Sequence, residues 1–212
     1  MTNDKYTHIL FDWDGTLAMM LDVWLHALRK VLESQGHHLS DKQIGADYEA
    51  FSQSFEEHES ENVIAMIEEA SAIAESLRLD VRLYPHAATV LRQLHSSGKK
   101  LAIVTTSTHA QIDPLLAKHN LTELFNVIIC ADDTTNIKPD PEPVLKAMTS
   151  LGAKPASTLI VGDSENDLKA ATSAGIDSAL FYPARHELFH DLTYLQSLKP
   201  SYVISDLSDL VH

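Results

Sequence analysis

Cysteine is almost absent from this chain, since Cys130 is the only one among 212 residues. A single thiol cannot form an intramolecular disulfide, so a disulfide framework is excluded and a hydrophobic core must hold the fold. Such sparing use of cysteine is typical of proteins in a reducing compartment. We therefore expect a cytoplasmic protein.

Long hydrophobic runs are missing as well. No apolar stretch approaches the roughly 20 residues that a membrane-spanning helix needs. The N-terminal residues lack a basic segment followed by an apolar stretch and a cleavage site, which is the pattern of a secretory signal. We expect no membrane partner and no targeting segment.

Positive charge is scarce: 16 Lys and Arg stand against 30 Asp and Glu, which gives a formal net charge of -14. This excess argues against unspecific attraction to nucleic acid, so we expect no nucleic-acid partner. It would also repel an anionic substrate unless the binding site supplied its own positive charge. A bound cation would supply it.

The chain does contain short apolar runs that alternate with helix-length amphipathic segments. The runs, rich in Val, Ile and Leu, are residues 8–12, 101–106, 126–130, 158–163 and 178–182. Continuous apolar runs of this length are typical of strands covered on both faces, as in a parallel sheet. Leu or Val recurs at helical spacing between them, in residues 87–98, 109–120, 141–152 and 165–175. This order predicts an α/β fold with a doubly wound parallel sheet.

One long segment breaks the alternation, because only helical patterns occur from Ala18 to about Leu83. Ser40 and Gln43 form a predicted capping box in it. Its two apolar faces are Leu21, Trp24, Leu25, Leu28 and Leu32, and Val63, Ile64, Ile67, Ala70, Ala74 and Leu77. We expect residues 1–17 and 84–212 to form the core and residues 18–83 to form an inserted all-helical domain, with linkers near residues 17–20 and 81–86.

Polar side chains follow four of the predicted strands. Ligands of open parallel sheets bind outside the carboxyl ends of the strands, so these side chains should converge. They are Asp12 and Asp14 after the first strand, Thr105, Thr106 and Ser107 after the second, Lys138 beyond the third, and Asp163 and Asp167 after the fourth. Carboxylates suit Mg²⁺, and Mg²⁺ with Lys and hydroxyl donors can clamp a phosphoryl group.

Four segments resemble, in order, the motifs of the haloacid dehalogenase-like superfamily: DWDGT (12–16), VTTS (104–107), KPDPEP (138–143) and GDSEND (162–167). The helical insert resembles the cap of its phosphoglycolate phosphatase and β-phosphoglucomutase branch. The match spans nearly the whole chain. It implies a Rossmann-like core with a cap, and Mg²⁺-dependent hydrolysis of a small phosphomonoester through an aspartyl-phosphate.

The resemblance also implies catalytic roles. Asp12 resembles the nucleophile and Asp14 the general acid/base. Thr105 and Lys138 resemble the groups that bind the oxygens of the transferring phosphoryl group, and the amide around Thr106 can face phosphate as well. Because Thr106 precedes a predicted helix together with Ser107, a simple N-cap remains the alternative.

The same resemblance implies a metal site. Asp12, the backbone carbonyl of Asp14 and Asp163 would supply the protein's Mg²⁺ ligands. Asp167 would orient Lys138 or a metal-bound water. An acidic residue in the first turn of a helix also complements the helix dipole, and this structural role remains the alternative for Asp167.

The second Asp, two residues after the first, suits phosphatases and mutases and disfavours dehalogenation. A phosphomutase of the β-phosphoglucomutase kind and a non-catalytic phosphate-binding module remain alternatives. The segment AMMLDVW (18–24) is apolar, with Met19 and Met20 expected nearest the pocket, and offers little to hold a sugar. This favours hydrolysis. The sequence does not specify a monomer or a homodimer.

The segment HELFH (186–190) fits the HExxH pattern of zinc proteases. A zinc site would need a helix that presents both His residues to a third ligand. The segment follows the fifth predicted strand, and the chain contains 12 His, so a chance match is easy. We expect a surface helix here, and substitution of either His186 or His190 should leave activity and metal content unchanged.

Overall fold

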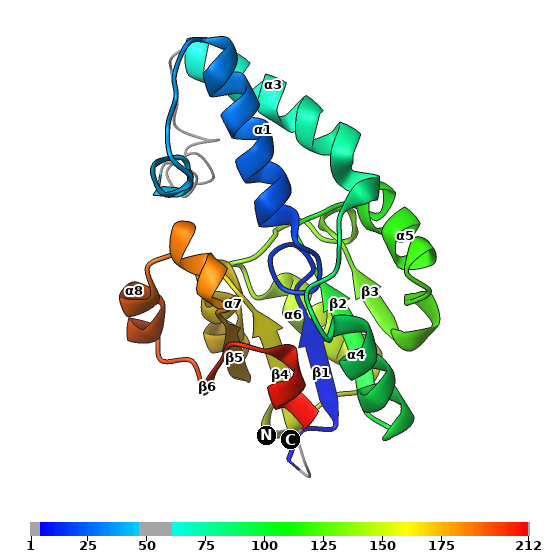
Figure 1. The fold of residues 1–212 in the computed structure, drawn as a ribbon. Helices are drawn as coiled ribbons and strands as arrows, with labels where there is room; N and C mark the ends of the chain where they lie inside the picture. Colours follow the sequence, from blue (N-terminus) through cyan, green and yellow to red (C-terminus); the bar gives the residue numbers. More distant parts are fainter. Residues whose placement is uncertain (1–4, 47–60, 212) are drawn as a thin grey trace.

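The computed structural model describes residues 5–46 and 61–211 (Figure 1). Its centre is a six-stranded sheet in the order β3-β2-β1-β4-β5-β6, and every neighbouring pair is parallel. The strands are β1 His8–Phe11, β2 Lys100–Val104, β3 Val127–Ile129, β4 Thr158–Gly162, β5 Asp177–Phe181 and β6 Tyr202–Ile204. The doubly wound fold and its first five strands are confirmed. The three-residue strand β6 was not predicted.

Helices cover both faces of the sheet, as its apolar strands require (Figure 1). They are α4 Ala87–Ser96, α5 His109–Lys118, α6 Glu142–Leu151 and α7 Glu165–Ala174, all predicted, and the short α8 Leu192–Ser197. Alternate side chains of β1 pack on opposite faces of the sheet. Ile9 and Phe11 lie in the hydrophobic cluster that contains α4 and α5, whereas Leu10 packs with α6 and α7.

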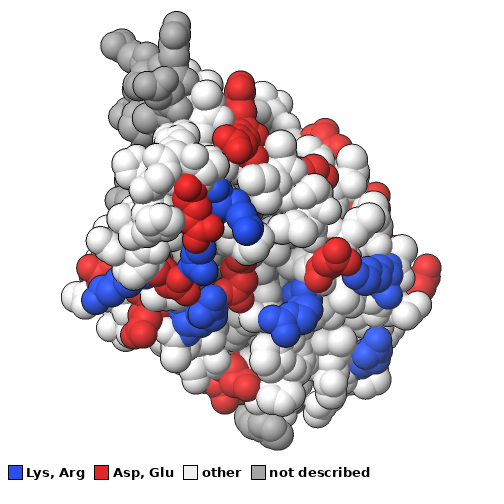
Figure 2. All heavy atoms as spheres, turned by 45° about the horizontal axis from the view of Figure 1, so that its top comes forward, with Lys and Arg blue, Asp and Glu red and all other residues white. Residues whose placement is uncertain are grey.

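Short 3-10 helices connect several of these elements. They are η2 Arg78–Asp80, η3 Thr122–Leu124, η4 Ala131–Asp133, η5 Pro155–Ser157, η6 Ala184–Leu188 and η7 Leu207–Val211. Among the helices of the described ranges, none is both long and apolar enough to cross a membrane. On the face shown in Figure 2, Lys and Arg lie interspersed with Asp and Glu.

The inserted segment lies beyond the end of the sheet opposite the two termini (Figure 1). It contains α1 Met20–Ser34, a helical turn at residues 41–46 and α3 Glu61–Leu77, so its described part is helical as predicted. The capping box is confirmed, because Gln43 accepts hydrogen bonds from the backbone and hydroxyl of Ser40. On the second predicted apolar face, Ile67, Ala70 and Ala74 are buried, whereas Ile64 is 44% exposed. The side chain of Val63 lies outside the described residues.

The two connections between the insert and the sheet run side by side. The amide of Met19 donates to the carbonyl of Arg82 at 2.8 Å, and the amide of Tyr84 donates to the carbonyl of Leu17 at 2.9 Å. The insert is thus joined to the core by one hydrogen-bonded pair of segments. The first of these segments follows β1 directly after Asp12 and Asp14, and the second leads from the insert to α4, which places the insert over the carboxyl end of the sheet.

Candidate active site

The turn after β1 brings its carboxylates close to those that follow β4. The amide of Asp12 still donates to Val161 of β4 at 2.9 Å, so Asp12 continues the strand register. Gly15 then takes a φ of +86°, and a Cβ there would lie 2.2 Å from Oδ2 of Asp163. Glycine is required at this position both by its conformation and by this close approach.

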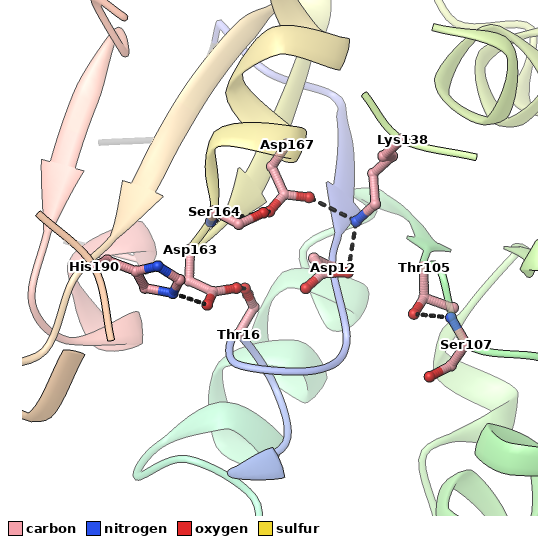
Figure 3. Close-up of polar contacts among 9 residues, drawn as sticks. All are labelled: Asp12, Thr16, Thr105, Ser107, Lys138, Asp163, Ser164, Asp167 and His190. Carbon is pink, nitrogen blue, oxygen red and sulfur yellow. Dashed lines mark hydrogen bonds and ion pairs between the residues drawn. The ribbon is translucent and has the colours of Figure 1, made fainter. Parts of the chain in front are cut away.

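Lys138 joins two of the buried carboxylates (Figure 3). Its Nζ donates to Oδ1 of Asp12 and to Oδ1 of Asp167, both at 2.6 Å. Oδ2 of Asp167 accepts from the amide and the hydroxyl of Ser164, the N-cap of α7. Asp167 therefore contacts Lys138 with one oxygen and closes the capping box with the other. It lies in the first turn of α7, as the helix-dipole alternative requires, but its capping role was not predicted.

The charged groups around Lys138 carry an excess of negative charge. Asp12, Asp163 and Asp167 each place an oxygen within 4.8 Å of the others, whereas Lys138 is the one ammonium that pairs with them in the described ranges. Burial raises the pKa of Asp12 well above its usual range; Lys138 opposes the rise, and the other two carboxylates add to it. Burial works against the charge of Lys138, but Asp12 and Asp167 outweigh it and raise the pKa of its ammonium.

This donor set fits Mg²⁺. Carboxylate oxygens are the ligands that hard cations prefer, and three carboxylates with one ammonium leave an excess of two negative charges that one divalent cation would neutralise. Asp163 is already oriented, because its Oδ1 accepts from the hydroxyl of Thr16 at 3.0 Å and its Oδ2 lies 3.3 Å from Nε2 of His190 (Figure 3). Burial would raise the pKa of Asp163, but His190, His186 and Thr16 together hold it below its usual value.

Asp14 has a different environment. Its Oδ2 accepts a hydrogen bond from the hydroxyl of Ser107 at 2.5 Å, and its Oδ1 lies 3.9 Å from the guanidinium of Arg78. Burial raises the pKa of Asp14, whereas Ser107 and Arg78 oppose the rise. A carboxyl group with a raised pKa is suited to carry a proton. Sequence reasoning missed Arg78, because a lone Arg at the end of a helical insert carries no motif.

The two threonines after β2 differ in their surroundings. Thr105 is buried, its hydroxyl accepts from the amide of Ser107 at 3.1 Å, and it does not line the pocket. Thr106 is exposed and lines the pocket. The N-cap of α5 is Thr108, so an N-cap role for Thr106 and Ser107 is wrong.

A pocket of about 290 Å³ opens over these groups. Its polar side contains five of the predicted site residues, namely Asp12, Asp14, Thr106, Lys138 and Asp163. Its apolar side is formed by Met20, Leu21 and Trp24 of α1 and by Ile137. The expectation for Met20 is confirmed. That for Met19 is wrong, because Met19 lines a separate hollow with Val81 and Arg82.

The HELFH segment is not a surface helix, so that expectation is wrong. It folds into η6 and the residues after it, and His186 is fully buried. Nε2 of His186 lies 2.7 Å from the hydroxyl of Tyr84, and burial lowers the pKa of this imidazole to about 4. His190 lines the pocket beside Asp163. The expectation that both histidines are dispensable depended on a surface helix, so the structure removes its basis.

Ser107→Ala should shift the pH dependence of turnover. Loss of the hydroxyl removes a donor that favours the ionised form of Asp14, so the pKa of Asp14 should rise further. The general-acid role that the resemblance implies for Asp14 requires its protonated form, so the alkaline limb of the kcat profile should move to higher pH. Steady-state rates across the pH range, with Ser97→Ala as the exposed control, measure this shift; an unmoved or lowered limb would contradict it.

Known proteins share this architecture. The family model for haloacid dehalogenase-like hydrolases matches residues 9–181. A pyrophosphatase PpaX from Halalkalibacterium halodurans is 32% identical over 210 residues, covering 96% of this chain and 94% of that protein. A phosphoglycolate phosphatase from Salmonella typhimurium is 44% identical over 96 residues, which is 45% of this chain and 38% of that enzyme. A Bacteroides fragilis structure, assigned to the haloacid dehalogenase-like hydrolases, matches with a TM-score of 0.77 at 29% identity and covers 97% of this chain and 100% of that one.

Proposed function

Because the chain belongs to the haloacid dehalogenase-like hydrolases, we propose that it is a Mg²⁺-dependent phosphatase that hydrolyses a small phosphomonoester through an aspartyl-phosphate on Asp12. The observation that carries the proposal is the convergence of Asp12, Asp14, Lys138 and Asp163 on one pocket. Phosphatase and pyrophosphatase are also the activities that its relatives' names state.

In the first step, a carboxylate oxygen of Asp12 attacks phosphorus, and the bond from phosphorus to the leaving oxygen breaks. Asp14 gives its proton to that oxygen, so the product leaves as an alcohol. In the second step, Asp14 takes a proton from a water molecule that attacks the same phosphorus. The bond to Asp12 breaks, inorganic phosphate leaves, and both carboxyl groups return to their starting states.

The remaining residues bind and orient. Lys138 holds one oxygen of Asp12 and supplies a positive charge for the phosphoryl oxygens, while Thr106 contacts them from the pocket wall. Thr105 acts through Ser107, whose amide it holds. Asp12, Asp163 and the carbonyl of Asp14 would hold Mg²⁺, which when bound offsets the repulsion between the attacking carboxylate and the phosphoryl group.

Metal exchange tests the cofactor. Chelation should abolish turnover, and both Mg²⁺ and Mn²⁺ should restore it, because both favour octahedral oxygen sites. Ca²⁺ should bind and inhibit, since its larger and looser coordination misplaces the nucleophile. Phosphate release after chelation and re-addition measures this. Full activity in excess chelator or in Ca²⁺ would refute the assignment.

An organic leaving group fits the pocket better than a second phosphate does. Within the described residues, Lys138 is the one Lys or Arg in the pocket wall, which leaves little charge to hold pyrophosphate. Met20, Leu21 and Trp24 instead offer apolar surface to the leaving group. A panel of phosphomonoesters and pyrophosphate, with released phosphate as the readout, tests the proposal. Turnover of pyrophosphate alone would overturn this substrate class.

We also expect hydrolysis to outrun isomerisation. A mutase must hold a sugar in two orientations while it excludes water from the aspartyl-phosphate. The α1 side of the pocket offers apolar side chains in place of hydroxyl-binding groups. Incubation with β-glucose 1-phosphate, a trace of the 1,6-bisphosphate and Mg²⁺ should release phosphate faster than it forms glucose 6-phosphate. The opposite order would make the protein a mutase.

The same proposal includes the domain boundaries, the kind of partner and the cellular location. Residues 1–17 and 84–212 form the catalytic core, and residues 18–83 form the cap. The partner is a small phosphorylated metabolite, not nucleic acid or a membrane, which agrees with the mixed charges of the face in Figure 2. The buried thiol of Cys130 suits a reducing cytoplasm.

A further inference from the structure

We propose that His190 is a positioning residue, whose ring N–H donates to Asp163 and holds that carboxylate in the orientation in which it binds Mg²⁺. The inference rests on the proposed function for the metal but assigns a role to His190, which lies outside the four motifs. Nε2 of His190 is 3.3 Å from Oδ2 of Asp163, and the imidazole is 10% exposed (Figure 3). It thus faces the metal site from the side opposite Lys138.

Asp163 needs such a contact because, within residues 5–46 and 61–211, its other hydrogen-bond donor is a single hydroxyl. Thr16 donates to Oδ1, and on its own this bond would let the carboxylate plane turn. His190 engages the second oxygen, so two donors from different segments define the plane. Partners that hydrogen-bond to ligating carboxylates typically tune metal affinity about 10- to 100-fold.

The backbone of His190 is fixed on both sides. Its amide donates to the carbonyl of His186 at 2.9 Å, and its carbonyl accepts from the hydroxyl of Tyr182 at 2.7 Å. Its ring packs edge-on against the ring of His186, with centroids 5.9 Å apart. His186 in turn is held by Tyr84. A residue that orients a metal ligand must itself be held in one position, and these contacts hold His190 in this way.

The cap also contacts the turn that carries His190. Phe189 is buried in the cluster formed by α1 and α3, and Leu188 packs against that cluster. A Cβ at Gly45 would lie 2.1 Å from the carbonyl oxygen of Leu188, so a cap backbone approaches this turn closely. Arg185 forms an ion pair with Asp22 of α1. The placement of His190 therefore depends on contacts with the cap as well as with the core.

Mg²⁺ affinity measured without substrate tests the role of His190. Calorimetric titration should give a dissociation constant for His190→Ala about tenfold or more above the wild-type value. His190→Gln, whose amide N–H can replace the ring donor, should restore affinity close to wild type. His86→Ala, which removes another His beside a carboxylate but outside the pocket, should change nothing. Unchanged or tighter Mg²⁺ binding by His190→Ala would overturn the proposal.

The same titrations separate this inference from the proposed function. If wild-type protein binds Mg²⁺ but hydrolyses no phosphoester, the function fails while the affinities still decide the role of His190; if it binds no Mg²⁺, the inference fails as well. Circular dichroism in chelator checks the fold of each variant. Should His190→Ala not fold, Tyr182→Phe removes only the hydroxyl that holds the His190 carbonyl. It should weaken Mg²⁺ binding by a smaller factor, and unchanged affinity would then refute the proposal.

Discussion

Asp12→Asn should lose turnover by a factor on the order of 10⁴ or more, because an amide cannot act as the nucleophile. The fold should survive. Lys138 keeps its bond to Asp167, and the substitution removes one of three crowded buried carboxylates. The temperature of unfolding in chelator should therefore stay level or rise. Phosphate release and thermal unfolding monitored by circular dichroism measure the two effects.

Asp80→Asn is the matched control for this change. Its side chain is 86% exposed, and the same loss of charge there should alter neither turnover nor stability measurably. Preserved turnover in a folded Asp12→Asn protein would remove Asp12 from the chemistry. An unfolded protein would instead contradict the claim that burial of Asp12 is unfavourable in the absence of metal.

Lys138→Met should have the largest effect on stability. It leaves Asp12 and Asp167 buried without the ammonium that both contact at 2.6 Å. Removal of one partner of a buried ion pair typically costs about 3–5 kcal/mol of unfolding free energy. Turnover should also fall, on the order of a hundredfold or more, because the positive charge for the phosphoryl group is lost. Urea unfolding and phosphate release measure these losses.

Two comparisons make the Lys138 result specific. Lys169→Met breaks an ion pair of the same 2.6 Å length with Glu165, but on the surface, and should change stability by less than about 1 kcal/mol. The double variant Lys138→Met with Asp167→Asn should recover part of the lost stability without recovering activity. A Lys138→Met protein as stable as Lys169→Met would contradict the role given to the buried network.

The predictable part of the fold follows from the parallel sheet. Residues 9–11 and 159–161 are continuously apolar because helices cover both faces of β1 and β4, so composition alone marks them as strands. The carboxyl ends of such strands meet at one edge, which is why Asp12 and Asp163 could be paired from the sequence. Strand β6 contributes only three residues, and Val203 within it is 42% exposed, so it leaves no comparable apolar run.

The missed parts of the site come from outside the strand ends. Arg78 reaches Asp14 from the end of the insert, and His190 reaches Asp163 from a turn after β5. Neither position follows from periodicity, because each depends on how distant segments pack. The HELFH pattern contains His190, which lines the pocket, but it assumes a regular α-helix, whereas the 3-10 helix η6 buries His186.

Trapping of the phosphorylated enzyme tests the central claim most directly. Asp14→Ala should still be phosphorylated by p-nitrophenyl phosphate, whose leaving group needs little protonation, but should lack the base that speeds hydrolysis of the intermediate. Mass spectrometry of the acid-quenched protein should then find a phosphoryl group on the peptide that contains Asp12. The double variant that also carries Asp12→Asn should show none. Release of phosphate by the wild-type protein with no covalent phosphoenzyme in any of these experiments would contradict the account.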